Sequence, residues 1–156
     1  MTIKKYKPDL ISIAIPLAVG GLSAFFTIKG MPYYEMQQKP FFTPPEAAFP
    51  IVWTILYILM GISAARIWKS NDPKKGRALK VYGLQLAANY IWSVIFFGLH
   101  QYFTAFLWLL FLIGLIVKMI AAFAPIDRTA AKLQIPYLIW CIFAAAVNFG
   151  VWRLNG

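Results

Sequence analysis

Charged residues are scarce in this chain of 156 residues. They make up 13% of it, whereas a soluble domain of average composition has about 25%. Hydrophobic residues make up 61%. So little polar material cannot coat a water-soluble globule, and lipid is therefore the expected solvent. Cysteine is nearly absent as well, and the single Cys141 excludes a disulfide within the chain.

Reactive groups are also missing from the apolar runs. No Asp, Glu or His lies clearly inside one of them, which argues against a proton- or ion-coupled transporter, because such proteins bury a titratable group. The chain has no Ser-His-Asp or Cys-His set, no paired carboxylates and no glycine-rich phosphate loop. His100 stands alone in a short loop, where a solvated side chain is expected rather than a metal ligand, and no metal site is predicted.

The net charge of +10 would suit a nucleic-acid-binding protein, but the placement of the charges argues otherwise. Basic residues cluster in short gaps between the apolar runs, as they do in loops beside a membrane. The predicted surroundings are therefore membrane lipid, with no nucleic-acid partner.

Five apolar runs reach, or nearly reach, the roughly 20 residues that a helix needs to cross a bilayer. They are residues 10–28, 47–65, 81–99, 101–124 and 133–152. In lipid each backbone must satisfy its own hydrogen bonds, which makes the runs helical. The first run could also be a signal peptide, but its length and the lack of a clear cleavage site favour a retained span. The sequence therefore predicts an all-α integral membrane protein, a five-transmembrane-helix bundle in one domain of residues 1–156.

Most of the 15 Lys and Arg residues lie on one side of these spans, at the amino terminus and in the second and fourth loops. This bias predicts an inside amino terminus and an outside carboxyl terminus. The first loop then faces outward. It is the longest connection, and its prolines, among them Pro40, Pro44 and Pro45, predict an ordered and functional segment.

One face of the third span carries Gln85, Asn89, Trp92 and Phe96 at spacings of three and four residues. Because an amide in hydrocarbon is costly unless it is hydrogen-bonded, this face must look into the bundle. Two interpretations remain open: the amides join helices, or they line a cavity.

Two other spans carry similar stripes. They are Tyr137, Trp140, Ala144 and Asn148 in the fifth span, and Trp53, Tyr57 and Gly61 in the second. Tryptophans near the span ends fit an aromatic belt at the membrane surface, but Trp53 and Trp92 lie deeper. A mostly aromatic cavity with a few polar groups is typical of a small-molecule site.

Several ordered motifs carry a family resemblance. They are Lys39-Pro-x-x-x-Pro-Pro, Val52-Trp-x-x-Leu-Tyr, Gln85-Leu-x-x-Asn-x-x-Trp and Pro136-Tyr-x-x-Trp-x-x-Phe-Ala. With them the chain resembles the TspO/MBR family, the tryptophan-rich sensory proteins related to the translocator protein, also called the peripheral benzodiazepine receptor.

The resemblance implies a membrane receptor or sensor, often dimeric, that binds porphyrins such as protoporphyrin IX and hydrophobic drug-like molecules in a pocket under the first loop. No cofactor is required, since porphyrin is the ligand or substrate. Together with the stripes, the resemblance predicts ligand contacts from Trp53, Tyr57, Asn89, Trp92, Phe96, Tyr137, Trp140, Phe143, Ala144 and Asn148. The predicted lid comprises Lys39, Phe42, Pro44 and Pro45, with Phe42 at a position where the family often has Trp. Lys39 is included for its charge and location alone.

Two alternative functions remain open. Some bacterial members of the family degrade porphyrin in light with oxygen, and the two tryptophans implicated match Trp53 and Trp140, which would then be catalytic. The other alternative is a carrier of tetrapyrroles or lipids. A homodimer is the expected assembly, and the small-residue pairs Gly83 with Ala87 and Ala146 with Gly150 are candidate seams.

Overall fold

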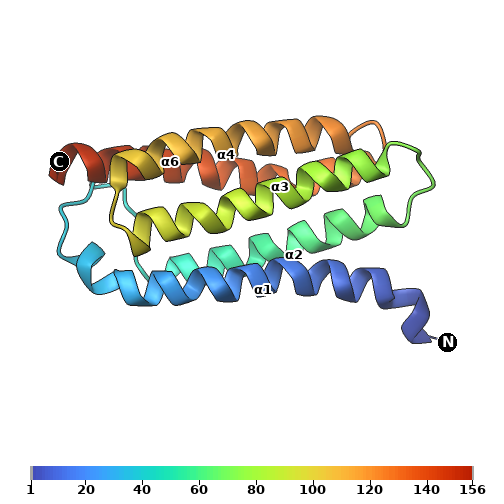
Figure 1. Cartoon of the computed structure of the whole chain (residues 1–156), viewed down its shortest axis with the longest axis horizontal. Coiled ribbons are helices and arrows are strands. Elements are labelled where there is room, and N and C mark those ends of the chain that lie inside the picture. The colour runs from blue at the N-terminus through green and yellow to red at the C-terminus, as the bar shows by residue number, and fades with distance from the viewer. Residues whose placement is uncertain (1, 156) are drawn as a thin grey trace.

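The computed structural model describes residues 2–155, and these residues form helices joined by short connections (Figure 1). The elements are α1 (Thr2–Glu35), α2 (Ala48–Trp68), α3 (Lys75–Ser93), the π-helix η1 (Val94–Gly98), α4 (Tyr102–Phe123), α5 (Arg128–Leu133) and α6 (Ile135–Asn155). Five helical stretches are long and apolar enough to cross a membrane. The predicted all-α five-helix bundle is confirmed.

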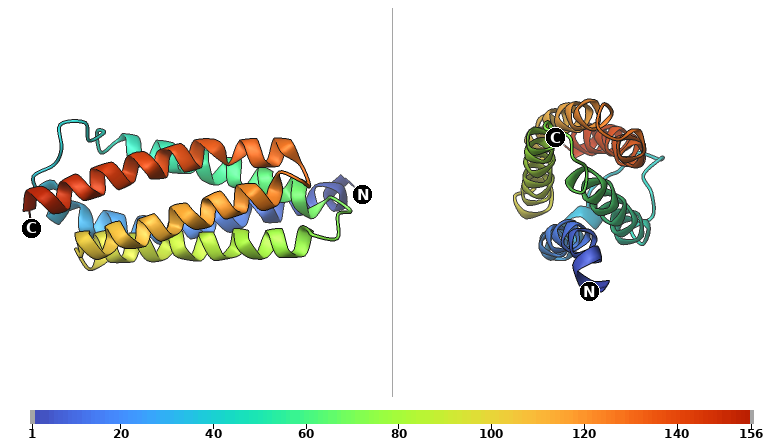
Figure 2. Two further views of the ribbon diagram at one scale, coloured as in Figure 1. Left: turned by 90° about the horizontal axis from the view of Figure 1, so that it is seen from above. Right: turned by 90° about the vertical axis from the view of Figure 1, so that its right-hand side faces the viewer.

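The long helices run side by side along the length of the molecule (Figures 1 and 2). Helix α1 packs on α2 and η1, α3 packs on α4, and α4 packs on α6. The carboxyl terminus and the connection between α1 and α2, which we call loop 1 (residues 36–47), lie at the same end of the bundle. The opposite end is tied by two ion pairs, Arg66 Nε with Asp127 Oδ2 and Lys69 Nζ with Asp9 Oδ1, each at 2.9 Å.

Helix α1 continues past the predicted span end at residue 28 and reaches Glu35, with Pro32 inside it. A proline removes one backbone hydrogen bond, but long membrane helices tolerate it because neighbouring elements compensate. Loop 1 is therefore shorter than the sequence suggests. Its start lies close to the last turn of α1, where Met36 N donates to Tyr33 O and Gln37 N donates to Tyr34 O.

Loop 1 is ordered because α6 holds it at three places. Asn155 bonds both backbone groups of Gln38, accepting from its N–H at 2.9 Å and donating to its carbonyl at 2.7 Å. Pro40 packs directly on Gly150, where any Cβ would collide with the proline ring. Farther along, the ring of Phe42 lies 6.1 Å from that of Phe143.

Two local features set the spacing of the helices near the site. Gly61 lets α2 approach α1 closely, since a Cβ there would lie 2.5 Å from the Cα of Ile13. The π-helix η1 widens one turn at the end of α3, and its consecutive side chains Phe96 and Phe97 are both buried. Of the two candidate dimer seams, Gly83 meets no atom within 4 Å among the described residues, whereas Gly150 is covered by loop 1.

Candidate functional site

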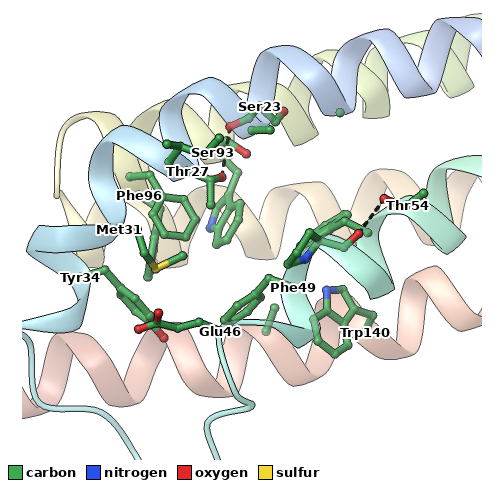
Figure 3. Close-up of a pocket in the computed structure, with 18 of the residues that line it drawn as sticks. Ser23, Thr27, Met31, Tyr34, Glu46, Phe49, Thr54, Ser93, Phe96 and Trp140 are labelled. Atoms are coloured by element: carbon green, nitrogen blue, oxygen red, sulfur yellow. Dashed lines mark hydrogen bonds between the residues drawn. The ribbon is translucent and has the colours of Figure 1, made fainter.

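A cavity of about 680 Å³ lies inside the bundle at the loop 1 end, walled by α1, α2, the α3–η1 junction and α6 (Figure 3). Its volume is within the range of roughly 300–1,000 Å³ typical of small-molecule sites. Its lining comprises Leu17, Gly20, Gly21, Ser23, Ala24, Thr27, Ile28, Met31, Tyr34, Pro44, Glu46, Phe49, Pro50, Trp53, Thr54, Tyr57, Trp92, Ser93, Phe96, Phe97, Trp140, Phe143, Ala144, Val147 and Asn148.

Aromatic rings form two groups on this wall. In one, the ring centroids of Trp53 and Trp140 are 6.5 Å apart and nearly perpendicular, and Trp53 stacks on Tyr57 at 5.6 Å. In the other, Trp92 and Phe96 are stacked with centroids 5.1 Å apart. Figure 3 shows Phe96 and Trp140 on different sides of the open centre. Flat apolar surfaces of this kind suit a planar guest.

Most residues predicted from the sequence come together here. The cavity lining includes Trp53, Tyr57, Trp92, Phe96, Trp140, Phe143, Ala144, Asn148 and the lid residue Pro44. The helical spacing that placed each set on one face therefore also brings faces of three different helices to one cavity. Their contact with a ligand stays a prediction.

Asn89 and Tyr137 lie behind the cavity wall, joined in a buried hydrogen-bond chain. The Tyr57 hydroxyl donates to Asn89 Oδ1 at 2.9 Å, and Asn89 Nδ2 donates to the Tyr137 oxygen at 2.8 Å. The Tyr137 hydroxyl in turn donates to Gln85 Oε1 at 2.6 Å. The chain ties α2, α3 and α6 together, so at these positions the structure favours the helix-joining interpretation.

A second bridge fixes the other aromatic group. Trp92 Nε1 donates to Asn148 Oδ1 at 3.2 Å, and Asn148 Nδ2 donates to the carbonyl of Tyr102 at 2.8 Å. Asn148 therefore joins α6 to α3 and to the start of α4. With its amide occupied, it holds the indole of Trp92 in one orientation against the cavity.

The remaining lid residues lie outside the cavity lining. Lys39 Nζ donates to the carbonyls of Tyr34, Glu35 and Gln37 at 3.1–3.2 Å, and thus closes the carboxyl end of α1. Phe42 and Lys39 line a shallow second depression against α6 instead. Pro45 lines neither.

The α1 wall is the part that the sequence analysis missed. Apart from the adjacent pair Gly20 and Gly21, its apolar lining residues recur at spacings of three or four, and they are Leu17, Gly20, Gly21, Ala24, Ile28, Met31 and Tyr34. That stripe contains small residues and few aromatics, so it was not singled out, although its period is the usual signal of one helical face.

Few polar atoms remain free toward the cavity. Ser23 Oγ and Trp140 Nε1 are buried and have no hydrogen-bond partner among the described residues. Among the residues that the structure describes, Glu46 is the only charged side chain in the lining. A hydrogen bond shared with the neighbouring Glu35 carboxyl is the main reason why the pKa of Glu46 is raised. No three His, Cys, Asp or Glu side chains gather into a candidate metal site within residues 2–155.

Comparison with known proteins identifies the family of this chain. The family model for the TspO/MBR family matches residues 12–153. The chain belongs to this family.

Family members from distant organisms align over most of their length. The chain is 37% identical over 150 residues to the tryptophan-rich protein TspO of Chlorobaculum tepidum, covering 93% of this chain and 94% of the relative. It is 38% identical over 125 residues to protein CrtK of Rhodobacter capsulatus, covering 79% and 78%. It is 36% identical over 130 residues to the translocator protein of Sus scrofa, covering 81% and 77%.

Family membership and the five spanning helices together make this TspO/MBR chain a multi-pass integral membrane protein. The predicted relationship to tryptophan-rich sensory and translocator proteins is confirmed. The cavity thus lies within a membrane protein, and loop 1 covers it at one end of the spans.

Proposed function

We propose that the protein is a membrane receptor or sensor that binds a planar hydrophobic molecule, a protoporphyrin-type tetrapyrrole or a drug-like ring system, in the cavity beneath loop 1. The observation that carries this proposal is the cavity itself, lined by Trp53, Trp92 and Trp140 on three helices. A relative from Cereibacter sphaeroides, 34% identical over 146 residues, is named tryptophan-rich sensory protein.

Ring stacking supplies the main attraction in this proposal. Aromatic pairs are worth about 0.5–1.5 kcal/mol each beyond the burial of apolar area. Trp53 and Trp140 meet edge to face, so together they form a corner that holds one edge of a disc while Trp92 and Phe96 offer a second surface. Pro44 of loop 1 and Phe49 in the first turn of α2 shield the guest from water.

A double substitution tests the stacking. Trp53→Phe with Trp140→Phe keeps apolar rings but removes both indoles, and we expect protoporphyrin IX to bind about three- to tenfold more weakly. Quenching of the protein's tryptophan fluorescence reports the titration. Trp68→Phe is the matched control, because Trp68 lies at the far end of α2, outside the lining. Unchanged affinity in the double variant would show that the indoles are not the binding surface.

A porphyrin-degrading enzyme is the second candidate, favoured by the adjacency of Trp53 and Trp140 in the lining. The test is to illuminate the protein with protoporphyrin IX under oxygen. A defined product that requires both indoles supports the enzyme, whereas the bleaching seen without protein supports the receptor. Carriage of tetrapyrrole or lipid would appear as flux across proteoliposomes.

We also propose a homodimer with the amino terminus inside and loop 1 outside. Cys141 is fully buried, so a cysteine introduced at an exposed position reports alone. Phe41→Cys in loop 1 should react with a membrane-impermeant reagent from the outside, and Asn71→Cys at the opposite end only after permeabilisation. The reverse pattern would overturn the orientation. Cross-linking through Gly83→Cys tests the exposed seam on α3.

A further inference from the structure

The rim of the cavity beneath loop 1 has an acidic character that the sequence did not suggest. Glu46, just before α2, lines the cavity, and every other lining residue is uncharged. Figure 3 shows its carboxylate near Tyr34, at the edge of the cavity. A ligand group placed at this edge meets a carboxylate first.

The charged and titratable groups around Glu46 come from α1 and loop 1. They are the carboxyl of Glu35, the phenol of Tyr34 and the ammonium of Lys39. Lys39 does not line the cavity, because its three donors are directed to carbonyls at the end of α1. The ammonium of Lys39 is thus directed to α1, although its charge still acts on Glu46, and Glu46 is the charged side chain that lines the cavity within residues 2–155.

A second polar feature lies deeper. Ser23 is only 6% exposed and lines the cavity, yet its Oγ has no partner among the described residues. Buried hydroxyls are normally hydrogen-bonded, and this one lies close enough to the Tyr57 hydroxyl to bond either that oxygen or a group that arrives with the guest. Besides the indole N–H of Trp140, the cavity therefore offers a hydroxyl inside and a carboxylate at the rim.

We propose that Glu46 makes the cavity selective for the charge of its guest, so that a flat ring system bearing a protonated amine binds most tightly, its neutral counterpart less tightly, and its carboxylate counterpart least. This inference rests on the proposed function, because it concerns the same cavity. The physical reason is that complementary charge at a site edge attracts, whereas like charge repels a wrong partner. A tetrapyrrole that carries two acids would then bind with its acid edge turned from Glu46, or with Glu46 protonated.

The preference has a predicted dependence on pH. The hydrogen bond with Glu35, then partial desolvation and the Glu35 charge, raise the pKa of Glu46, while Lys39 opposes them. Protonation of Glu46 removes the negative charge at the rim. The preference for an amine should therefore be fully present above this raised pKa and fade as the pH falls through it.

The experiment uses three ligands with one ring: protoporphyrin IX, its dimethyl ester, and a derivative in which each acid is converted to an amide bearing a primary amine. Their affinities for the full-length protein in detergent are measured by tryptophan quenching. Glu46→Gln should weaken the amine about threefold and strengthen the acid about threefold, in line with a partly exposed charge pair, and leave the ester unchanged. The constant ester affinity shows that the variant is folded.

Two further variants separate the rim from general electrostatics. Asp72→Asn makes the same change in net charge in the connection between α2 and α3, and should leave all three affinities unchanged. Glu35→Gln removes the neighbour but not the lining carboxylate, so the amine preference should remain and persist to lower pH. Equal affinities for the three ligands in the wild-type protein, or the same pattern in Glu46→Gln as in the wild type, would overturn the inference. Failure of the ester to bind the wild-type protein would instead overturn the proposed function.

Discussion

The buried hydrogen-bond chain behind the cavity gives a prediction whose size can be worked out from the structure. Tyr137 is 1% exposed and makes two side-chain hydrogen bonds, donating to Gln85 and accepting from Asn89. Tyr137→Phe removes one oxygen and leaves an amide oxygen and an amide N–H without partners. Hydrogen bonds between membrane helices are worth about 0.6–1.7 kcal/mol each, so the expected loss of unfolding free energy is about 1–3 kcal/mol.

Tyr82→Phe is the matched control for this change. Tyr82 is also a buried tyrosine, 7% exposed on α3, but its hydroxyl has no partner among the described residues. The same deletion there should be neutral or stabilising, because it removes a polar group that burial penalises.

Unfolding of each variant in mixed detergent with increasing sodium dodecyl sulfate, followed by circular dichroism, measures the free energies. Equal losses for Tyr137→Phe and Tyr82→Phe would refute the reasoning, because the effect would then follow the lost oxygen and not the lost bonds. Ligand affinity, measured under conditions where both variants are folded, should stay within about twofold of the wild type, since neither residue lines the cavity.

Other parts of the structure give two shorter predictions. Gly150→Ala should displace loop 1 from α6, which speeds proteolysis of the loop and weakens ligand binding. Gly114→Ala should do neither, because a Cβ there would contact no other element of the described residues within 4 Å. Asp127 caps α5 by accepting from Ala130 N–H and also pairs with Arg66, so Asp127→Ala should cost about 1 kcal/mol of stability. Partial burial alone would raise the pKa of Asp127, but the Ala130 and Arg66 contacts together lower it. The folded state therefore favours the carboxylate form of Asp127 more than the unfolded state does. This contribution to the unfolding free energy is present above the unfolded pKa and should be lost as the pH falls through the lowered native pKa. The difference in unfolding free energy between the wild type and Asp127→Ala, measured from neutral to acidic pH, should therefore become smaller as the pH falls.

The sequence predicted the helical faces well because lipid leaves the backbone only one choice. In hydrocarbon an amide side chain must find a partner, so the stripe of Gln85, Asn89 and Trp92 had to face the bundle, and all three are buried. The choice between helix joining and cavity lining was harder. It depends on whether a partner hydroxyl lies across the interface, as Tyr137 does for Asn89, and that distance is a property of the packed helices.

Loop 1 shows what the sequence could not give. The first apolar run ends at residue 28, so the sequence did not show that α1 continues to Glu35 and brings its last carbonyls close to Lys39. In the structure those carbonyls accept from its ammonium, as the negative end of a helix favours a nearby cation. Lys39 therefore adds no positive charge to the cavity lining, although its charge and its place in the sequence put it among the predicted lid residues.

The two kinds of polar residue in the bundle have separate consequences for recognition. Asn89 and Asn148 spend their hydrogen bonds on other helices, so they fix the positions of Tyr57 and Trp92 without adding polarity to the lining. The wall that remains is almost wholly apolar, and such a wall gives affinity for many flat molecules but little orientation. In the proposal, discrimination among them depends on the few polar groups left at the cavity, and among these the exposed carboxylate of Glu46 at the rim exerts the longest-ranged force. The same packing would then accept many flat ring systems and select among them by their charge.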